Sequence, residues 1–334
     1  MIIKHHILFA VRQILRKKLL NIAVLVSLGG GIATLVLIAF YAYKEWDYDR
    51  YHPHAKNIYR IITEYGTGPE TNRIAWTSGA VATAIREQMP EVTQAVRLFR
   101  YRSPSILREQ QSNKTFSEEN FIWADANVFD IFAFEFIKGT PDQGLKRPNT
   151  MVITESASRR YFGEIDPVGK VLANVTFNAD FEITGVIRDM PERSHFKAEF
   201  ICSLATLPTL WGGILDSWGN SFLYTYVDIQ PDADVSQIKN KLNEILQTKI
   251  PVTEEASMLL SLQPLIDIHL NSRIQNEWRA NGDVKYVYML LLTGVLILLI
   301  SVVNFVNLGI ARSENRTKEI GIRQTLGISK DQLL

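Results

Sequence analysis

The chain has 334 residues, with 36 Lys and Arg against 35 Asp and Glu, 46% hydrophobic residues and a mean hydropathy close to zero. These averages exclude a disordered chain, a collagen and a small disulfide scaffold. The balanced charge disfavours a nucleic-acid binder with a large basic surface, and the single cysteine, Cys202, cannot form an internal disulfide.

Two long stretches contain no Asp, Glu, Lys or Arg: residues 19–43 and residues 286–311. At about 1.5 Å per residue, a helix of either length exceeds the hydrocarbon core of a bilayer, which is about 30 Å thick. A buried core helix is the alternative, but such helices are usually shorter and carry polar positions. A cleaved signal peptide is disfavoured because the first stretch is too long and has no clear A-x-A site. The sequence therefore predicts two transmembrane helices.

Charge at the flanks of these stretches predicts their orientation. Residues 1–18 are basic without any acid and have apolar side chains at helical spacing, which predicts a cytoplasmic amphipathic helix on the inner leaflet. Residues 312–334 are also net basic, whereas the long segment between the spans is net acidic. The positive-inside rule then places both termini in the cytoplasm and residues 44–285 outside.

Small residues recur in the first predicted span. Ala23, Ser27 and Gly31 lie at four-residue intervals, and Gly30 lies beside them. Small side chains at this spacing let a second helix approach closely, so we predict a transmembrane packing face at these four positions. The alternative is that lipid tolerates the glycines without any partner helix.

The segment between the spans alternates short strands and helices. Strands are expected at residues 58–62, 92–101, 171–177, 181–187, 196–201 and 222–229, helices at 80–89, 155–162 and 235–246, and extended chain at 259–270; residues 129–137 are aromatic and largely alternating. This order predicts a membrane protein in which two helices flank a large α+β extracytoplasmic domain, with two lobes and both ends at the membrane.

No signature of a catalytic or metal centre is present in the sequence. It has no phosphate-binding loop, no H-E-x-x-H or G-x-S-x-G motif, and no Cys and His set at metal-ligand spacing. His52 and His54 flank a proline, and we interpret them as part of a turn because no further ligands accompany them. We therefore expect no catalytic residue, no metal and no bound cofactor in this chain.

A series of motifs follows in order along the chain: residues 46–52, 58–60, 128–132, 136–139, 152–156, 161–163, 166–170, 185–191, 194–196, 304–308, 311–313, 318–323 and 326–327. Together they resemble MacB-like/FtsX-like ABC transporter permeases, in particular Bacteroidota-type members of the type VII ABC superfamily. The resemblance covers essentially the whole chain, and the order of the motifs carries it rather than any single one.

The resemblance implies that residues 44–285 are the periplasmic core domain of a multi-pass protein of the bacterial inner membrane. The chain would be a permease subunit, or a fragment of one, that transmits ATP-driven motion for export or extraction of peptides, antibiotics or lipoproteins. ATP and Mg²⁺ would bind to a separate ATPase subunit, so this chain would not be an enzyme. Other implied partners are a second permease copy, a periplasmic adaptor and membrane lipids.

The resemblance further implies that residues 312–334 form a truncated cytoplasmic segment that contacts the ATPase. Apolar side chains among basic ones suit a partner groove, although basic residues there would also fix membrane topology in any protein. The expected contact residues are Arg312, Arg316, Lys318, Glu319, Ile320, Gly321, Ile322, Arg323, Leu326 and Gly327. Because the family continues with further membrane helices, we expect this chain to be a fragment or to take those helices from another chain.

Other functions remain open at this point. An FtsX-like regulator of a cell-wall hydrolase would share the same architecture without transporting anything. A membrane-anchored sensor would share the two spans, but residues 312–334 are too few for a kinase or a methyl-accepting helix. A membrane-anchored enzyme would need a catalytic set that the sequence does not display.

Overall fold

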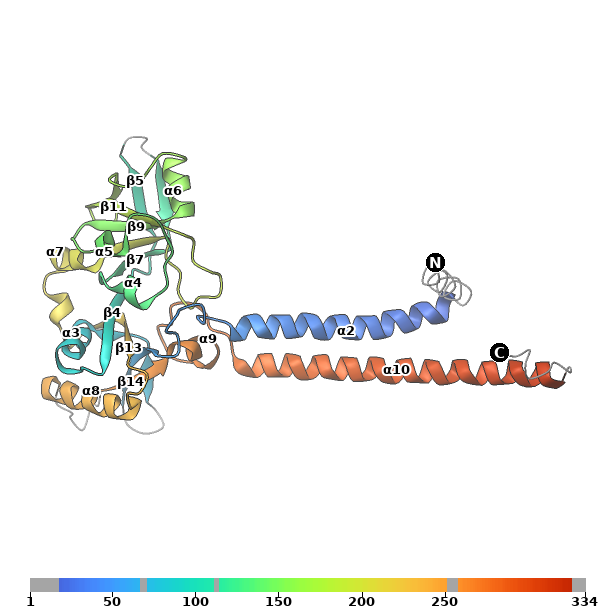
Figure 1. The fold of residues 1–334 in the computed structure, drawn as a ribbon. Coiled ribbons are helices and arrows are strands. Elements are labelled where there is room, and N and C mark those ends of the chain that lie inside the picture. Colours follow the sequence, from blue (N-terminus) through green and yellow to red (C-terminus); the bar gives the residue numbers. More distant parts are fainter. Residues whose placement is uncertain (1–17, 67–70, 111–113, 251–257, 326–334) are drawn as a thin grey trace. The chain divides into compact units, whose positions relative to one another are not determined.

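A computed structural model describes residues 18–66, 71–110, 114–250 and 258–325 (Figure 1). These residues form two units, one of residues 18–46 with 284–325 and one of residues 47–283. Nearly all of the predicted amphipathic helix at residues 1–18 lies outside the described residues.

The first unit is a pair of long helices, α2 (Lys18–Trp46) and α10 (Val284–Thr325). In α2 the residues from Leu25 to Trp46, and in α10 those from Val284 to Ile310, are long and apolar enough to cross a membrane. Many of their large apolar side chains are exposed, as expected of helices whose surroundings are lipid rather than protein. The two apolar helices predicted from the sequence are thus present, and α10 continues as a helix well beyond its charge-free stretch.

The second unit is an α+β domain built on one mixed sheet (Figure 1). The strands lie in the order β14-β1-β13-β4-β7-β12-β9-β11-β10-β5-β6, with β2, β3 and β8 pairing at its sides. Most pairs are antiparallel, and β9 with β11 and β7 with β12 are parallel. The strands are β1 (Ile58–Tyr65), β2 (Asn72–Ile74), β3 (Thr77–Ser78), β4 (Val92–Arg100), β5 (Ser105–Glu109), β6 (Thr115–Glu118), β7 (Phe121–Ala124), β8 (Phe136–Lys138), β9 (Thr150–Thr154), β10 (Val171–Asn174), β11 (Ala179–Ile187), β12 (Phe200–Ser203), β13 (Ser221–Ile229) and β14 (Met258–Pro264).

Helices cover this sheet and several were predicted from local signals. The helix α6 begins after Thr154, whose side chain accepts a hydrogen bond from Ala157 N, and ends at Gly163, which has a φ of +62°. The helix α8 begins after Asp234, whose side chain accepts from Ser236 N. The helices are α3 (Gly79–Gln88), α4 (Val128–Ile131), α5 (Pro141–Gly144), α6 (Glu155–Phe162), α7 (Leu207–Trp211), α8 (Val235–Lys249) and α9 (Ile268–Asn271).

Three expected extended segments have other bounds in the structure. The aromatic, largely alternating residues 129–137 contribute to α4 and to the short β8. The expected strand 171–177 ends at Asn174, because its side chain accepts from Phe177 N and forms a turn. The expected strand 196–201 begins only at Phe200, and extended chain at 259–270 ends at Pro264, after which α9 follows.

Buried aromatic side chains form the core beneath the site described below. Phe132, Phe196 and Tyr226 pack in one hydrophobic cluster with ring centroids 5.1 to 5.2 Å apart. Aromatic pairs at this separation and near-perpendicular angle are favourable. The polar side chains described below therefore lie against a closely packed aromatic cluster. The division of the domain into two lobes stays a prediction.

Candidate functional site

The segment that follows α2 is held inside the domain by a loop between β11 and β12. We call residues 47–52 the anchor segment and residues 188–197 the strap. Both were parts of motifs in the sequence, but nothing there indicated that they meet. The structure brings them together through a cluster of buried polar side chains.

Asp49 is the centre of this cluster and is fully buried. Its Oδ1 accepts a hydrogen bond from His195 N at 3.1 Å and lies 2.9 Å from His195 Nδ1. Its backbone N donates to Arg193 O at 3.0 Å, and its φ of +58° lies in the left-handed region, which Asp tolerates better than most residues. The backbone of the anchor segment thus turns sharply where the carboxylate enters the core.

His195 connects this carboxylate to the sheet. Its Nε2 lies 2.7 Å from the hydroxyl of Tyr226, which is buried in β13. Asp49, His195 and Tyr226 therefore form a continuous polar chain from the anchor segment, through the strap, to an interior strand. Buried polar chains of this kind hold the segments that they join in a defined arrangement. Two buried atoms of this chain, Asp49 Oδ2 and His195 Nδ1, have no hydrogen-bond partner among the described residues.

Two further residues of the anchor segment bind to neighbouring elements. His52 Nδ1 accepts from Ala133 N at 3.0 Å, and its ring packs edge-on against Phe132. The hydroxyl of Tyr51 donates to Ser194 Oγ at 3.2 Å. The anchor segment is thus attached both to the strap and to the chain that follows α4.

The strap has contacts along its length. Arg193 forms an ion pair with Asp47 at the start of the anchor segment. Arg188 makes a two-bond ion pair with Glu135, with both N···O distances 2.7 Å. Asp189 accepts from the backbone N of Ser156 at 3.1 Å, at the first turn of α6, where a carboxylate is favoured by the helix dipole. The strap therefore ties the anchor segment to two other parts of the domain.

Burial and charge set the protonation states of these groups. Burial alone would raise the pKa of Asp49, but the charge and hydrogen bonds of His195 outweigh it and hold the pKa below its ordinary value of 3.8. Burial lowers the pKa of His52 from 6.5 to about 4, and the nearby His195 adds to this, while Asp49 opposes it. At neutral pH His52 is therefore uncharged and Asp49 is ionised.

An acid–histidine–hydroxyl chain resembles part of a hydrolase triad, but the geometry does not serve catalysis. The hydroxyl on His195 Nε2 belongs to Tyr226, which has no exposed surface, and burial raises the pKa of that phenol. The Ser194 hydroxyl instead contacts Tyr51 and Asp49. Within the described ranges no group of three or more His, Cys, Asp or Glu residues could hold a metal ion. The arrangement is suited to holding two chain segments together.

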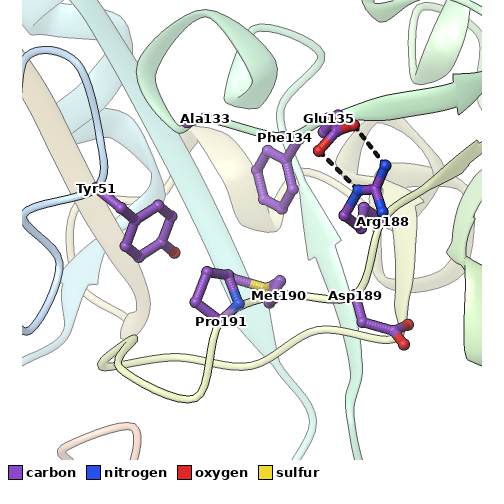
Figure 2. Close-up of a pocket in the computed structure, with 8 residues that line it drawn as sticks. All are labelled: Tyr51, Ala133, Phe134, Glu135, Arg188, Asp189, Met190 and Pro191. Atoms are coloured by element: carbon purple, nitrogen blue, oxygen red, sulfur yellow. Dashed lines mark hydrogen bonds and ion pairs between the residues drawn. The ribbon is translucent and has the colours of Figure 1, made fainter. Parts of the chain in front are cut away.

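An open pocket of about 320 Å³ lies beside the anchor segment and the strap (Figure 2). Tyr51 lies on one side of it, and the Glu135–Arg188 pair lies on the other, with Met190 and Pro191 between them (Figure 2). A change in spacing between the anchor segment and the strap would therefore alter this pocket.

The predicted packing residues of α2 fall into different environments. A Cβ added to Gly31 would lie 2.7 Å from Ser301 Cβ of α10, so the two helices approach closely there. Ser27 Oγ accepts from Asn304 Nδ2 of α10 at 3.0 Å. Gly30 instead has open space at its Cβ position, and its carbonyl accepts from Thr34 Oγ1. The side chain of Ala23 is not among those described.

The predicted ATPase-contact residues lie at the end of α10. Arg312 to Arg323 are helical, and Ile322 is 62% exposed, while the side chains of the other predicted residues there are not described. Leu326 and Gly327 lie outside the described residues. The role of all ten residues stays a prediction.

Comparisons with known proteins agree with the fold. A family model described as "MacB-like periplasmic core domain" matches residues 22–245. A solved structure of "a domain of a putative Permease protein from Porphyromonas gingivalis" is 25% identical, covers 72% of this chain and 100% of that chain, and has a TM-score of 0.57. None of the curated proteins that were compared matches the chain.

Two other solved structures are less similar. The periplasmic region of MacB from Actinobacillus actinomycetemcomitans is 17% identical over 61% of this chain and 89% of that chain, with a TM-score of 0.43. The extracellular domain of the noncanonic ABC-type transporter YknZ from Gram-positive bacteria is 12% identical over 62% of this chain and 100% of that chain, with a TM-score of 0.45.

Proposed function

The chain belongs to the MacB-like periplasmic core domain family, and we propose that it transmits motion from its membrane helices to its periplasmic domain. The chain would be a permease subunit of an ABC-type transporter, or part of one. Both termini would lie in the cytoplasm, and residues 44–285 would lie in the periplasm, as a multi-pass protein of the inner membrane.

The observation that supports this proposal is the attachment of the anchor segment. Asp49 follows the last residue of α2, Trp46, by only three positions, and it is fixed in the core by His195 and by the backbone of Arg193. A flexible linker at this point would absorb a displacement of the helix end. A buried, hydrogen-bonded attachment instead passes such a displacement to the strap and, through Tyr226, to the sheet.

The energy for this motion would come from a partner. We propose that ATP and Mg²⁺ bind to a separate ATPase subunit and that the residues from Arg312 to Gly327 contact it. A second permease copy, or membrane helices from another chain, would complete the membrane part. This chain would then bind no cofactor of its own and catalyse no reaction.

The ATPase contact can be tested by purification from the native host. The tagged chain should retain an ATPase that carries a phosphate-binding loop, and the double reversal Glu319→Arg with Arg323→Glu should release it. A matched reversal on the outer domain, Glu244→Arg with Lys239→Glu, should retain it. If the unmodified chain captures no ATPase, the transporter proposal is wrong.

The transmission can be tested in the resulting complex without knowing the cargo. Addition of ATP should change amide hydrogen exchange in the strap, and Asp49→Ala should abolish this change while ATP hydrolysis continues. Asp125→Asn is the control, because it weakens another buried ion pair, with Arg97, away from the anchor segment. An Asp49→Ala complex that still shows the ATP-dependent change would contradict transmission through this attachment.

A further inference from the structure

The segment between α9 and α10 is attached to the domain by buried polar contacts, as the anchor segment is. We call residues 272–283 the return segment; α10 begins directly after it, at Val284. We propose that Arg60 of β1 and Tyr226 of β13 couple its attachment to that of the anchor segment, so that loosening either attachment loosens the other. The coupling goes beyond the proposed function, because it is a property of the domain itself and needs neither an ATPase nor a cargo.

The return segment is held through Glu277. Both oxygens of its carboxylate accept from Arg60, Oε2 from Nη1 at 2.7 Å and Oε1 from Nη2 at 2.8 Å. The Arg60 side chain has no exposed surface, and its Nη2 also donates to Gln263 Oε1 at 2.6 Å and to Ser272 Oγ at 3.3 Å. Because a buried guanidinium without its carboxylate is strongly destabilising, this pair holds the return segment on β1.

The return segment also contacts the strap. Trp278 is 3% exposed, and the centroid of its ring lies 5.5 Å from that of Phe196 in the strap. One residue position separates Trp278 from Asn276, whose backbone O accepts from the hydroxyl of Tyr224 at 2.8 Å. Trp278, Phe196 and Tyr224 belong to one buried hydrophobic cluster. The return segment and the strap therefore lie in the same packed region, where a shift of one is felt by the other.

The register of the sheet places Arg60 beside Tyr226. The two are opposite residues of the antiparallel pair β1 and β13, and Gln263 of β14 is opposite Arg60 on its other side. Opposite residues in an antiparallel pair point to the same face, with Cβ atoms about 4.5 to 5.5 Å apart. Because the Tyr226 hydroxyl lies 2.7 Å from His195 Nε2, this row of side chains connects Glu277 with His195 of the strap.

The buried charge of Arg60 explains how the two attachments are coupled. Burial raises the pKa of the Tyr226 phenol, and the charge of Arg60 is the strongest influence that opposes it. The Nε of Arg60 is already buried without a hydrogen-bond partner among the described residues, so on loss of Glu277 the guanidinium needs another acceptor. The Tyr226 oxygen is on the same face, and turning it towards Arg60 would remove its contact with His195 and loosen the strap. Coupling of this kind is reciprocal, so loosening the strap should also loosen the return segment.

The coupling can be tested by amide hydrogen exchange on the full chain purified in detergent. Glu277→Gln removes the charge that pairs with Arg60 and should speed exchange in the strap by about fivefold. Asp49→Asn should speed exchange in the return segment by a similar factor. Ser272→Ala removes only one hydroxyl from the same cluster and should change exchange in the strap less but in the same direction, which keeps the test open if Glu277→Gln folds poorly.

The matched control is Asp125→Asn, which weakens another buried arginine pair in the same sheet, with Arg97. Arg97 follows Val96, the residue opposite Tyr226, so its side chain points to the other face of the sheet. The control should leave exchange in the strap and in the return segment unchanged. If Glu277→Gln speeds exchange in the buried strand β9 as much as in the strap, the effect is general destabilisation and the proposal is wrong.

Tyr226→Phe tests the connection itself, because it removes the hydroxyl that contacts His195 and keeps the ring. In this background Glu277→Gln should cause no further change in exchange of the strap. A further increase of the same size would show that the ring contact of Phe196 with Trp278 carries the coupling, and would overturn the role of Arg60 and Tyr226. Unchanged exchange of the strap in both Glu277→Gln and Ser272→Ala would overturn the coupling altogether.

Discussion

Asp49 Oδ1 lies 2.9 Å from His195 Nδ1, and each of the two side chains is 1% exposed. The two residues are 146 positions apart in the sequence, one just after a membrane helix and the other in a loop between two strands. Their contact joins the membrane-proximal end of the chain to the interior of the domain. Stability and motion of the domain should therefore both depend on this pair.

Replacing Asp49 should destabilise the domain strongly. Asp49→Ala removes the carboxylate that accepts from His195 N and lies 2.9 Å from His195 Nδ1, and it places Ala at a φ of +58°, so we expect a loss of about 3 kcal/mol in the free energy of unfolding. Asp49→Asn keeps an acceptor and tolerates the left-handed backbone, and should lose about 1 kcal/mol. Denaturant unfolding followed by tryptophan fluorescence measures both, and equal losses would contradict the role given to the carboxylate.

Acidification should destabilise the domain through His52. Its pKa is about 4 when folded and 6.5 ordinarily, so between these values the unfolded chain binds a proton that the folded chain does not. Stability is thus complete above pH 6.5 and falls as the pH drops towards 4, by about 2 kcal/mol between pH 7 and pH 5. The lowered pKa of Asp49 adds a second loss only below about pH 3.8.

The variant His52→Asn isolates this effect. The Asn Oδ1 can accept from Ala133 N in place of Nδ1, but the side chain does not titrate. The free energy of unfolding of this variant should change little between pH 7 and pH 5. His54→Asn, at an exposed histidine, is the control and should keep the full pH dependence of the unmodified chain. The same slope in both variants would assign the dependence to other groups.

The parts of the fold that carry local signals could be predicted from the sequence. Thr154 and Gly163 delimit α6, Asp234 begins α8, and the absence of charge marks both apolar helices. Strands such as β7 and β9 had no such signal, because every residue in them is buried and no alternation results. Their parallel partners, β12 and β11, are distant in sequence, so the order of the sheet is a tertiary property.

The contacts of the candidate site could be predicted from local sequence signals even less than the order of the strands. The residue types of the anchor segment and the strap were visible as motifs, and His195 between Ser194 and Phe196 is an unusual polar residue beside an aromatic core. Which carboxylate it meets depends on how β11, β12 and β13 are arranged. Local spacing therefore could not identify the pair of Asp49 and His195.

Asn243 of α8 should stabilise the outer edge of the sheet. Its side chain accepts from Leu260 N and donates to Leu260 O, both at 2.8 Å. These are backbone groups on the outer side of β14 that a neighbouring strand would otherwise pair with. Asn243→Leu should lose about 1–2 kcal/mol in the free energy of unfolding. Asn240→Leu, at an exposed position of the same helix, should change it by less than about 0.5 kcal/mol. Similar values for both would show that the edge contact contributes nothing.

The close approach of α2 and α10 at Gly31 predicts a difference between neighbouring glycines. A side chain at Gly31 would collide with Ser301, whereas one at Gly30 would enter open space. Gly31→Ile should therefore separate the helices locally, and Gly30→Ile should not. The pair Ser27→Cys and Asn304→Cys reports on this, because the native side chains are hydrogen bonded at 3.0 Å and the native Cys202 is buried. Oxidation should crosslink the reporter pair in the Gly30→Ile background and much less in the Gly31→Ile background; equal crosslinking in both would mean that the helices are not packed through Gly31.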